Sequence, residues 1–525
     1  MRFTQDHHSA PSKRFAWRVY AVLAAYVGLF AWRLRDCFVD DAFIVFQYLR
    51  NLTSGQGFVF FPGGPAVEGI TNIGWLFVLA PFAAVLGPAA AAKLLGLVLV
   101  LVAMGLTILL GQRLAAAVGR DRAIAGLAVV PVVLLASNFS FLYFSLAGME
   151  TALMAVVLLA AAGLALRRAD SLWLPVLAAL AFLVHPEGVV LLPLYTLLAL
   201  GTAAADQRRL LLGNLLLAVL LGAITAVRWG YFHDLLPNTF HSKPSNVLRV
   251  AASGFGFLAG QNVNIPFPVS GWLALPVLVL GYLRLRAAAP AAAAMLGAIA
   301  LTGLAFGIYS PPDWSQMGRY FAPYLPATLI LFWVGLVEAT GRLLARVSLR
   351  PAAGIAAMAV ILLVVVVSVF NGVKKLAQMD DFPGYVLASR NLVAPSLWIR
   401  DHLPDDATIA TRRIGALAYF SDKAVFDYTS GLPDAQVARL VAGCGHRFNL
   451  PTDPALAELW PRRSPDFLLE DAEMIDLIAS QSGGTRHRFT VHGLPYGVMK
   501  SFAIGRQKQW VLARRLDEDI AQATP

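Results

Sequence analysis

The chain has 525 residues, of which 58% are hydrophobic and only 14% are charged, and its mean hydropathy is +0.66. So little charge excludes a soluble globular protein of this length and indicates a polytopic α-helical membrane protein. In such a chain the net charge of +11 reflects basic loops that set orientation, so no nucleic-acid partner is expected.

Apolar segments that could each cross a bilayer core, which takes about 20 residues, recur along the chain. The first, 15–32, follows a basic N-terminus and runs into "RLRDC" without a small-residue cleavage site, so we interpret it as a retained anchor. The short apolar segment 73–86 either dips into the membrane, giving about eleven crossings, or is one of three crossings, giving about thirteen. Further spans are expected near 91–110, 123–144, 151–166, 172–184, 189–202, 210–229, 271–285, 290–308, 321–340 and 351–370.

Arginine-rich loops at 113–122, 167–168, 208–209, 284–286 and 342–350 define the orientation. If all of them face the cytoplasm, the N-terminus is also cytoplasmic and everything after residue 370 lies outside. For a bacterial protein this means the inner membrane with a periplasmic C-terminal domain. We therefore expect a transmembrane catalytic domain over 1–370 and a small α/β domain over 371–525.

The predicted α/β domain has recognisable strand and helix signals. Strands are predicted at 407–411 and 424–428, with a short helix or turn between them and a helix from residue 433. The segments "DFLLED" and "YGVMKSF" predict further strands.

Polar side chains gather in the loops assigned to the outer face, where their cost at membrane depth makes them functional candidates. Asp40 and Asp41 open an amphipathic helix, and helix capping could explain one carboxylate but not both. Lys243 and Arg319 are cations suited to a lipid phosphate. The same loops also carry Glu68, Asn72, His185, Glu187, Asn238, His241 and Tyr320. The simpler interpretations are a helix start for Glu187, a hydrogen-bonded turn for His185 and interfacial snorkelling for Arg319.

An ordered set of segments carries a family resemblance: "DDAFIVFQYLRNLTSGQGFVF", "AVEGITNIGW", "SLAGMETAL", "HPEGVVLLP", "LPNTFHSK", "MGRYFAPYLP" and, near the C-terminus, "DDATIATRRIGALAYFSDKAVFDYTSGLPD". The set resembles the GT-C glycosyltransferases that use polyprenyl-phosphate sugars, most of all the mycobacterial-type terminal arabinofuranosyltransferase group. Glu68 and Asn72 match the loop motif of that group, and Lys243 matches its "PNTxxxK" lysine. Two residues depart from it: His185 stands where an arginine usually precedes Pro-Glu-Gly, and Arg413 stands where an acid often precedes Ile-Gly.

The resemblance implies a donor such as decaprenyl-phosphate arabinose, an acceptor that is a glycan, glycolipid or protein, and an aspartate base, a role that falls on Asp40 or Asp41. A carboxylate would take the acceptor's proton and cations would stabilise the leaving phosphate, with inversion at the anomeric carbon. Neighbouring helical residues diverge by about 100°, so the two aspartates are expected to have different roles. We assign the base to Asp41 and an orienting role, toward Asp41 or a metal, to Asp40, and the sequence alone leaves open which of the two is the base.

Other functions remain open from the sequence. Asp40, Asp41 and Glu68 could hold a divalent metal ion through oxygen ligands, although no metal-specific spacing is present and no other cofactor is expected. A transporter or flippase of lipid-linked sugars would show internal repeats, which we do not find. An O-antigen-ligase-type enzyme that uses a diphosphate-linked glycan, or an accessory subunit, would also fit the composition.

Overall fold

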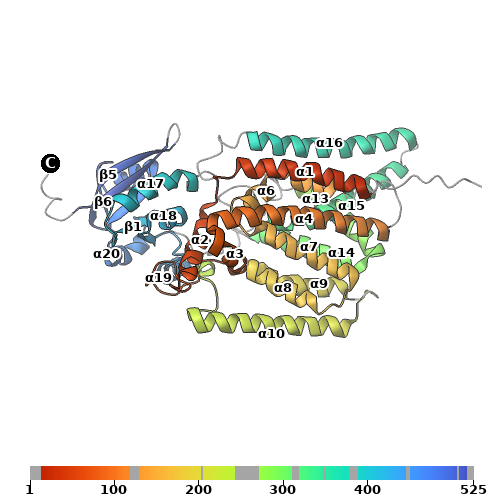
Figure 1. The fold of residues 1–525 in the computed structure, drawn as a ribbon, viewed down its shortest axis with the longest axis horizontal. Coiled ribbons are helices and arrows are strands. Elements are labelled where there is room, and N and C mark those ends of the chain that lie inside the picture. The colour runs from red at the N-terminus through yellow and green to blue at the C-terminus, as the bar shows by residue number, and fades with distance from the viewer. Residues whose placement is uncertain are drawn as a thin grey trace, which may run out of the picture.

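The computed structural model describes residues 13–118, 129–200, 202, 205–242, 271–309, 318–346, 350–377, 388–444, 448, 450–504 and 508–516. A bundle of long helices and a small α/β domain follow one another along the longest axis of the molecule (Figure 1). The helices of the bundle and its outer loops are α1 (Lys13–Arg33), α2 (Asp40–Thr53), α3 (Ile73–Leu86), α4 (Pro88–Val118), α5 (Val130–Ala136), α6 (Phe139–Leu146), α7 (Thr151–Arg167), α8 (Trp173–Val184), η2 (Pro186–Val190), α9 (Leu191–Ala199), α10 (Gln207–Phe232), α11 (Asn238–His241), α13 (Gly271–Ala288), α14 (Pro290–Tyr309), η3 (Ala322–Tyr324), α15 (Leu325–Arg346) and α16 (Arg350–Ala377).

The apolar helices confirm the predicted class of polytopic α-helical membrane protein. Within the described ranges, five helices are long and apolar enough to cross a membrane, or six if α6 and α7, bent by 113° at a short break, count as one span. Helices suit this environment because they satisfy their own backbone hydrogen bonds where water is absent. The expected eleven to thirteen crossings remain a prediction.

The structure differs from the expected spans in the middle of the bundle. The expectation of one continuous helix over 123–144 is wrong in its described part, because α5 ends at Ala136 and α6 begins at Phe139. The Asn138 side chain accepts a hydrogen bond from the N–H of Phe141 at 2.9 Å and so starts a new helix. The expected spans 172–184 and 189–202 are short helices, α8 and α9, separated by the 3₁₀ segment η2. Helix α3, at 14 residues, is too short to cross upright.

The C-terminal domain contains one six-stranded mixed sheet with the order β2-β1-β3-β6-β5-β4. Strands β1, β2 and β3 are parallel, whereas β3, β6, β5 and β4 pair antiparallel. The four predicted strands are confirmed, and so are the helices that follow the first two. The elements are α17 (Ala388–His402), β1 (Thr408–Thr411), α18 (Ile414–Ser421), β2 (Ala424–Asp427), α19 (Ala435–Cys444), η5 (Pro454–Leu456), α20 (Leu459–Arg463), β3 (Phe467–Asp471), α21 (Ala472–Gln481), β4 (Arg488–Val491), β5 (Leu494–Ile504) and β6 (Lys508–Arg515).

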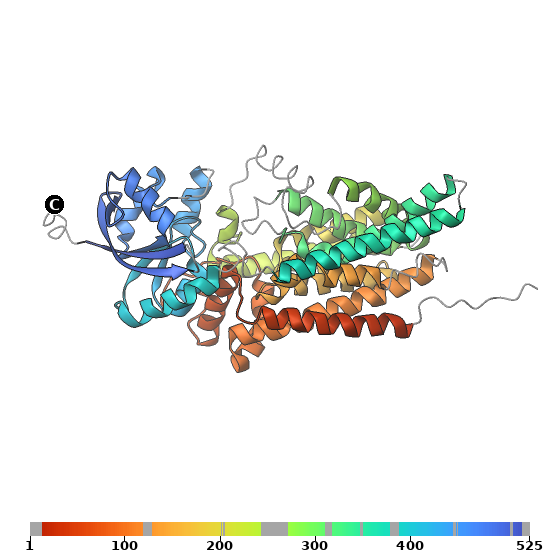
Figure 2. The same ribbon diagram turned by 90° about the horizontal axis from the view of Figure 1, so that it is seen from above.

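The C-terminal domain docks on the bundle through α18 and α2. Both views place α2 at the junction of the two parts (Figures 1 and 2). The backbones meet at Gly415, where a Cβ atom would lie 2.0 Å from the carbonyl oxygen of Asp40. Beside this contact the ring of Phe43 packs on those of Tyr419 and Phe420, with centroids 5.4 and 5.1 Å apart. Only glycine fits at position 415, so the sequence encodes a close helix–helix contact here.

Candidate active site

A cavity of about 320 Å³ lies where loops at one end of the bundle face the C-terminal domain. Its walls come from several segments that are far apart in the chain and converge at the docking junction. The lining residues are Asp40, Asp41, Ile44, Val45, Gly69, Ile70, Thr71, Asn72, Met149, Glu150, His185, Thr239, Arg319, Tyr320, Arg412, Arg413, Ile414, Asp427, Thr429, Ser430 and Leu432. Of the eleven residues predicted from the sequence, the structure thus gathers Asp40, Asp41, Asn72, His185, Arg319 and Tyr320 around one cavity.

Asp41 and Arg319 form an ion pair at the wall of this cavity. Arg319 Nη1 donates a hydrogen bond to Asp41 Oδ2 at 2.6 Å, and the two side chains are 15% and 35% exposed, Arg319 being the more buried. The Arg319 guanidinium also lies over the ring of Tyr320, 4.8 Å from its centroid. Since Asp41 is in the first turn of α2 and keeps access to the cavity, its carboxylate is placed to meet a ligand.

Asp40 has a different environment. Its carboxylate accepts hydrogen bonds from the backbone N–H groups of Ala416, at 2.9 Å, and Gly415, at 3.2 Å, at the start of α18. Burial raises the pKa of Asp40, while these N–H donors and the charge of Arg413 act in the opposite direction. Helix capping explains neither aspartate, because the N-cap of α2 is Val39. Asp40 therefore fastens the C-terminal domain to α2.

A second wall is a chain of hydrogen-bonded polar side chains. Asn72 donates to Glu150 Oε2 at 2.6 Å, and His185 Nε2 lies 3.7 Å from the other oxygen of Glu150. His185 Nδ1 is paired with Glu187, whose other oxygen accepts from the hydroxyl of Tyr324 at 2.9 Å. Glu187 itself does not line the cavity. Carboxylate and amide oxygens accept hydrogen bonds from hydroxyl groups, so this wall suits a polyol better than a phosphate.

Three more predicted residues do not line the cavity and hold loops in place. Glu68 is 4% exposed and forms a buried ion pair with Arg228 of α10, with Nε 2.9 Å from Oε2. Asn238 donates to the carbonyl oxygens of Gly431 and Leu432, and its own N–H donates to the carbonyl of Glu68 at 2.8 Å. The third is His241, which pairs with Asp234 at 3.2 Å, and Lys243 lies outside the described residues.

The three carboxylates that the sequence suggested as cation ligands do not share a partner. Asp40 binds backbone N–H groups, Asp41 pairs with Arg319, and Glu68 pairs with Arg228. In the described part of the chain, no three His, Cys, Asp or Glu side chains come together as metal ligands. The arrangement therefore gives the hypothesis of a cation held by these three residues no support.

The C-terminal domain contributes residues to the cavity that were not predicted from the sequence. Arg412 and Arg413 follow β1 directly, and Thr429 and Ser430 follow β2, so all four lie at the carboxyl ends of parallel strands. Ligands of α/β sheets bind at this edge. The two predicted strands and this rule together would have pointed to the four residues. Asp427 shapes the second loop by accepting from the N–H groups of Thr429 and Ser430, both at 3.1 Å.

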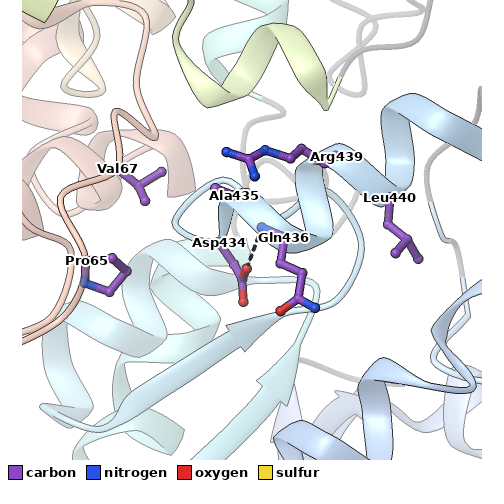
Figure 3. A pocket seen from close by; sticks show the side chains of 7 residues that line it. All are labelled: Pro65, Val67, Asp434, Ala435, Gln436, Arg439 and Leu440. Carbon is purple, nitrogen blue, oxygen red and sulfur yellow. Dashed lines mark hydrogen bonds between the residues drawn. The ribbon is translucent and has the colours of Figure 1, made fainter. Parts of the chain in front are cut away.

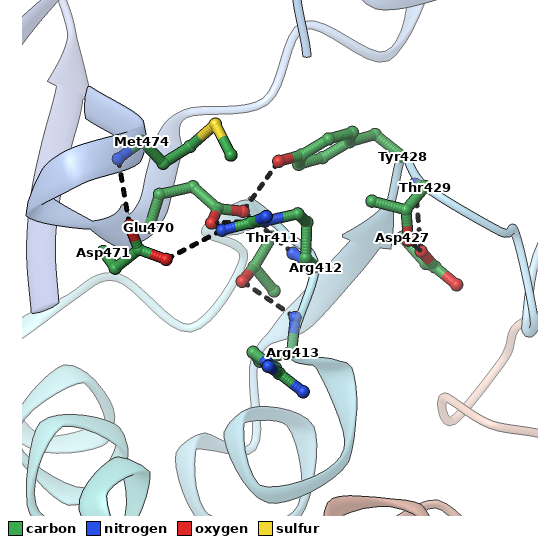
Figure 4. Close-up of polar contacts among 9 residues, drawn as sticks. All are labelled: Thr411, Arg412, Arg413, Asp427, Tyr428, Thr429, Glu470, Asp471 and Met474. Atoms are coloured by element: carbon green, nitrogen blue, oxygen red, sulfur yellow. Dashed lines mark hydrogen bonds and ion pairs between the residues drawn. The ribbon is translucent and has the colours of Figure 1, made fainter. Parts of the chain in front are cut away.

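Behind this edge a partly buried ionic cluster fixes Arg412 (Figure 4). Its Nε lies 2.9 Å from Glu470 and its Nη2 lies 2.8 Å from Asp471, both at the end of β3. The hydroxyl of Tyr428 donates to Glu470 at 2.8 Å. Arg412 is thus bound within its own domain, whereas the side chain of Arg413 points away from the cluster.

A second hollow of about 710 Å³ lies between α19 and the loop 54–72, which joins α2 to α3 (Figure 3). Pro65 and Val67 line one side, and Asp434, Gln436 and Arg439 line the other. In the described part of the chain, the loops of the bundle and the C-terminal domain thus enclose this hollow as well as the cavity.

Comparisons with known proteins agree with this architecture. Residues 386–523 match a sequence-family model described as a domain of unknown function, DUF8728. No curated protein matches the sequence significantly. The archaeal oligosaccharyltransferase AglB from Archaeoglobus fulgidus, in complex with an inhibitory peptide and a dolichol-phosphate, is similar in structure, with a TM-score of 0.55 and 11% identity over 90% of this chain and 71% of that chain.

ArnT from Cupriavidus metallidurans is similar over nearly the whole of both chains. Its undecaprenyl-phosphate-bound form has a TM-score of 0.53 and 12% identity over 94% of this chain and 98% of that chain. Its apo form has a TM-score of 0.54 and 15% identity over 95% and 98%. The chain thus has a GT-C-like fold, a helical membrane bundle followed by a small α/β domain.

Proposed function

We propose that the protein is an inverting membrane glycosyltransferase that moves a sugar from a polyprenyl-phosphate donor to a cell-envelope glycan, glycolipid or protein. The observation that carries the proposal is the Asp41–Arg319 pair on a cavity between the bundle and the C-terminal domain. Such a cavity can receive a lipid headgroup from the bilayer and a polar acceptor from the water. The relatives whose structures hold dolichol-phosphate or undecaprenyl phosphate have the same fold.

In the proposed reaction Asp41 accepts the proton of the acceptor hydroxyl as that oxygen bonds to the anomeric carbon of the donor. The bond between this carbon and the phosphate oxygen breaks, and polyprenyl phosphate leaves with the electron pair. A single displacement inverts the anomeric centre. Cations beside the leaving phosphate stabilise the charge that develops on it.

The wall formed by Asn72, Glu150 and His185 is proposed to hold the transferred sugar. These side chains present carboxylate, amide and imidazole groups to the same cavity that Asp41 lines. The resemblance of the sequence to arabinofuranosyltransferases makes arabinofuranose the sugar we propose.

We propose that the protein lies in the bacterial inner membrane with the cavity on the periplasmic side. The start of α1 and the C-terminal domain lie at opposite ends of the bundle (Figure 1), and the basic loops favour a cytoplasmic N-terminus. A cavity next to the C-terminal domain would then face the periplasm, where envelope acceptors are found.

The test is transfer from a labelled lipid donor in membranes that contain the overexpressed protein. Decaprenyl-phosphate arabinose is the first donor, and other polyprenyl-phosphate sugars follow. Product formation with wild type and none with Asp41→Asn is the expected result. Wild-type membranes that transfer nothing from any of these donors to extracted envelope glycans would refute the proposed function.

A further inference from the structure

Three arginines of the described residues line the cavity, and they differ in the side chains with which they pair. Arg319 is held by Asp41, and Arg412 is held by Glu470 and Asp471. Arg413 lines the same cavity, but within the described residues its guanidinium has no carboxylate within ion-pair distance. The contact of Arg413 is a backbone one, from its N–H to the hydroxyl of Thr411 at 3.2 Å. Among the described residues that line the cavity, Arg413 is therefore the cation available to an anionic ligand.

A second polar group in the cavity is also without a partner in the described part of the chain. Thr239 follows Asn238 in α11, is 8% exposed, and its buried hydroxyl has no hydrogen-bond partner. Thr239 lines the cavity together with Arg413. Buried polar groups are normally satisfied, and an unsatisfied one in a native protein is explained by strain, by a catalytic role or by a bound water or ion.

The geometry of displacement decides which arginine suits the leaving phosphate. The base and the leaving group of a single displacement act on opposite faces of the anomeric carbon. Arg319, whose Nη1 is 2.6 Å from Asp41, is fixed on the side of the base. Arg413 projects from the C-terminal domain, and the nearby carboxylate of Asp40 is already bound by the N–H groups of Gly415 and Ala416.

We propose that Arg413 of the C-terminal domain, with Thr239 of α11, binds the phosphate of the lipid donor. A guanidinium offers two parallel N–H donors to phosphate oxygens, and a threonine hydroxyl offers a third. The inference rests on the proposed function and deepens it, because it makes the C-terminal domain part of the donor site. The sequence signal is the arginine at 413, where the resembling enzymes often have an acid.

The experiment measures equilibrium binding of undecaprenyl phosphate to the purified full-length protein in detergent, by the change in intrinsic tryptophan fluorescence. Two matched ligands separate the tail from the charge. Undecaprenol has the lipid tail without the charge, and inorganic phosphate has the charge without the tail. Arg413→Gln removes the positive charge, and Arg413→Lys keeps the charge but lacks the two parallel N–H donors of the guanidinium. Arg486→Gln is the control variant, because Arg486 precedes β4 at the far edge of the sheet and pairs only with Asp476 among the described residues.

We expect Arg413→Gln to weaken undecaprenyl phosphate binding by about 10- to 100-fold, the range for a hydrogen-bonded charge. Arg413→Lys should fall between this variant and wild type, and Arg486→Gln should bind like wild type. Undecaprenol should bind all four proteins equally. Size-exclusion profiles and melting temperatures identify any variant that fails to fold, and Arg413→Lys then carries the comparison.

Equal binding of undecaprenyl phosphate by wild type and the Arg413 variants would overturn the inference while leaving the proposed function intact. A loss confined to inorganic phosphate would overturn the assignment to a lipid. Wild-type protein that does not bind undecaprenyl phosphate at all would refute the inference and the lipid-phosphate donor of the proposed function together.

Discussion

Asp41→Asn removes a negative charge from the wall of the cavity and keeps the size of the side chain. The lost group is the carboxylate whose Oδ2 lies 2.6 Å from Arg319 Nη1. Removing a positioned general base slows a reaction by about 10²- to 10⁴-fold, which raises the barrier by about 2.7 to 5.4 kcal/mol. The ion pair is partly exposed, so its loss costs about 1 kcal/mol or less of stability. We therefore expect a folded protein with almost no transfer.

The neighbouring substitution Asp40→Asn is the matched control for this prediction. An asparagine oxygen can still accept the N–H of Ala416, so we expect the transfer rate to fall by less than about threefold. Initial rates with a labelled polyprenyl-phosphate sugar, divided by the amount of folded protein, give the comparison. If Asp41→Asn keeps more than about a tenth of the wild-type rate, or if Asp40→Asn loses as much activity at unchanged stability, the assignment of the base to Asp41 is wrong.

Three further predictions concern stability. Gly415→Ala places a Cβ atom 2.0 Å from the carbonyl oxygen of Asp40, and such overpacking costs about 1–3 kcal/mol of stability. We therefore expect faster proteolytic release of the C-terminal domain, and an unchanged rate of cleavage would argue against tight docking. Glu68→Gln leaves the charge of Arg228 buried without its partner, and we expect about 3–5 kcal/mol of destabilisation in thermal unfolding, with Arg228→Met in the same protein recovering part of it. Burial raises the pKa of Asp40 above its ordinary value of 3.8. The contribution of protonated Asp40 to the free energy of unfolding is therefore complete below pH 3.8 and is lost as the pH rises through the raised pKa. Asp40→Asn should thus flatten the dependence of the unfolding midpoint on pH above 3.8, and an unchanged profile would contradict the burial of this carboxylate.

Much of the fold could be predicted from local sequence signals. Hydrophobic segments indicated the helices of the bundle, and short runs of apolar and β-branched residues indicated β1, β2, β3 and β5, because both signals depend on neighbours in the chain. The break at Asn138 was missed, since a polar cap within an apolar stretch looks the same as a tolerated residue inside a helix.

The candidate site was harder to predict, because its residues meet only through tertiary contacts. Asp41 and Arg319 stood out as opposite charges on outer loops, and the structure pairs them across 278 residues of sequence. Glu68 had the same appearance in the sequence, but its partner is Arg228 on α10, which lay inside an expected span. In the sequence, Arg413 stood out only because the resembling enzymes often have an acid at this position. The docking of the C-terminal domain on the bundle brings Arg413 to the cavity.

The adjacency of Asp40 and Asp41 has a mechanical consequence. One residue is fastened to the first turn of α18, and the next faces the cavity with its carboxylate against Arg319. A single peptide unit therefore links the position of the C-terminal domain to the position of the Asp41 carboxylate. A hinge movement that lifted α18 away would pull on the first turn of α2 and shift Asp41 at the same moment. Separation of the two parts of the molecule and displacement of Asp41 would be one motion, so if Asp41 is the proposed base, it would be in position only when the C-terminal domain is docked on the bundle.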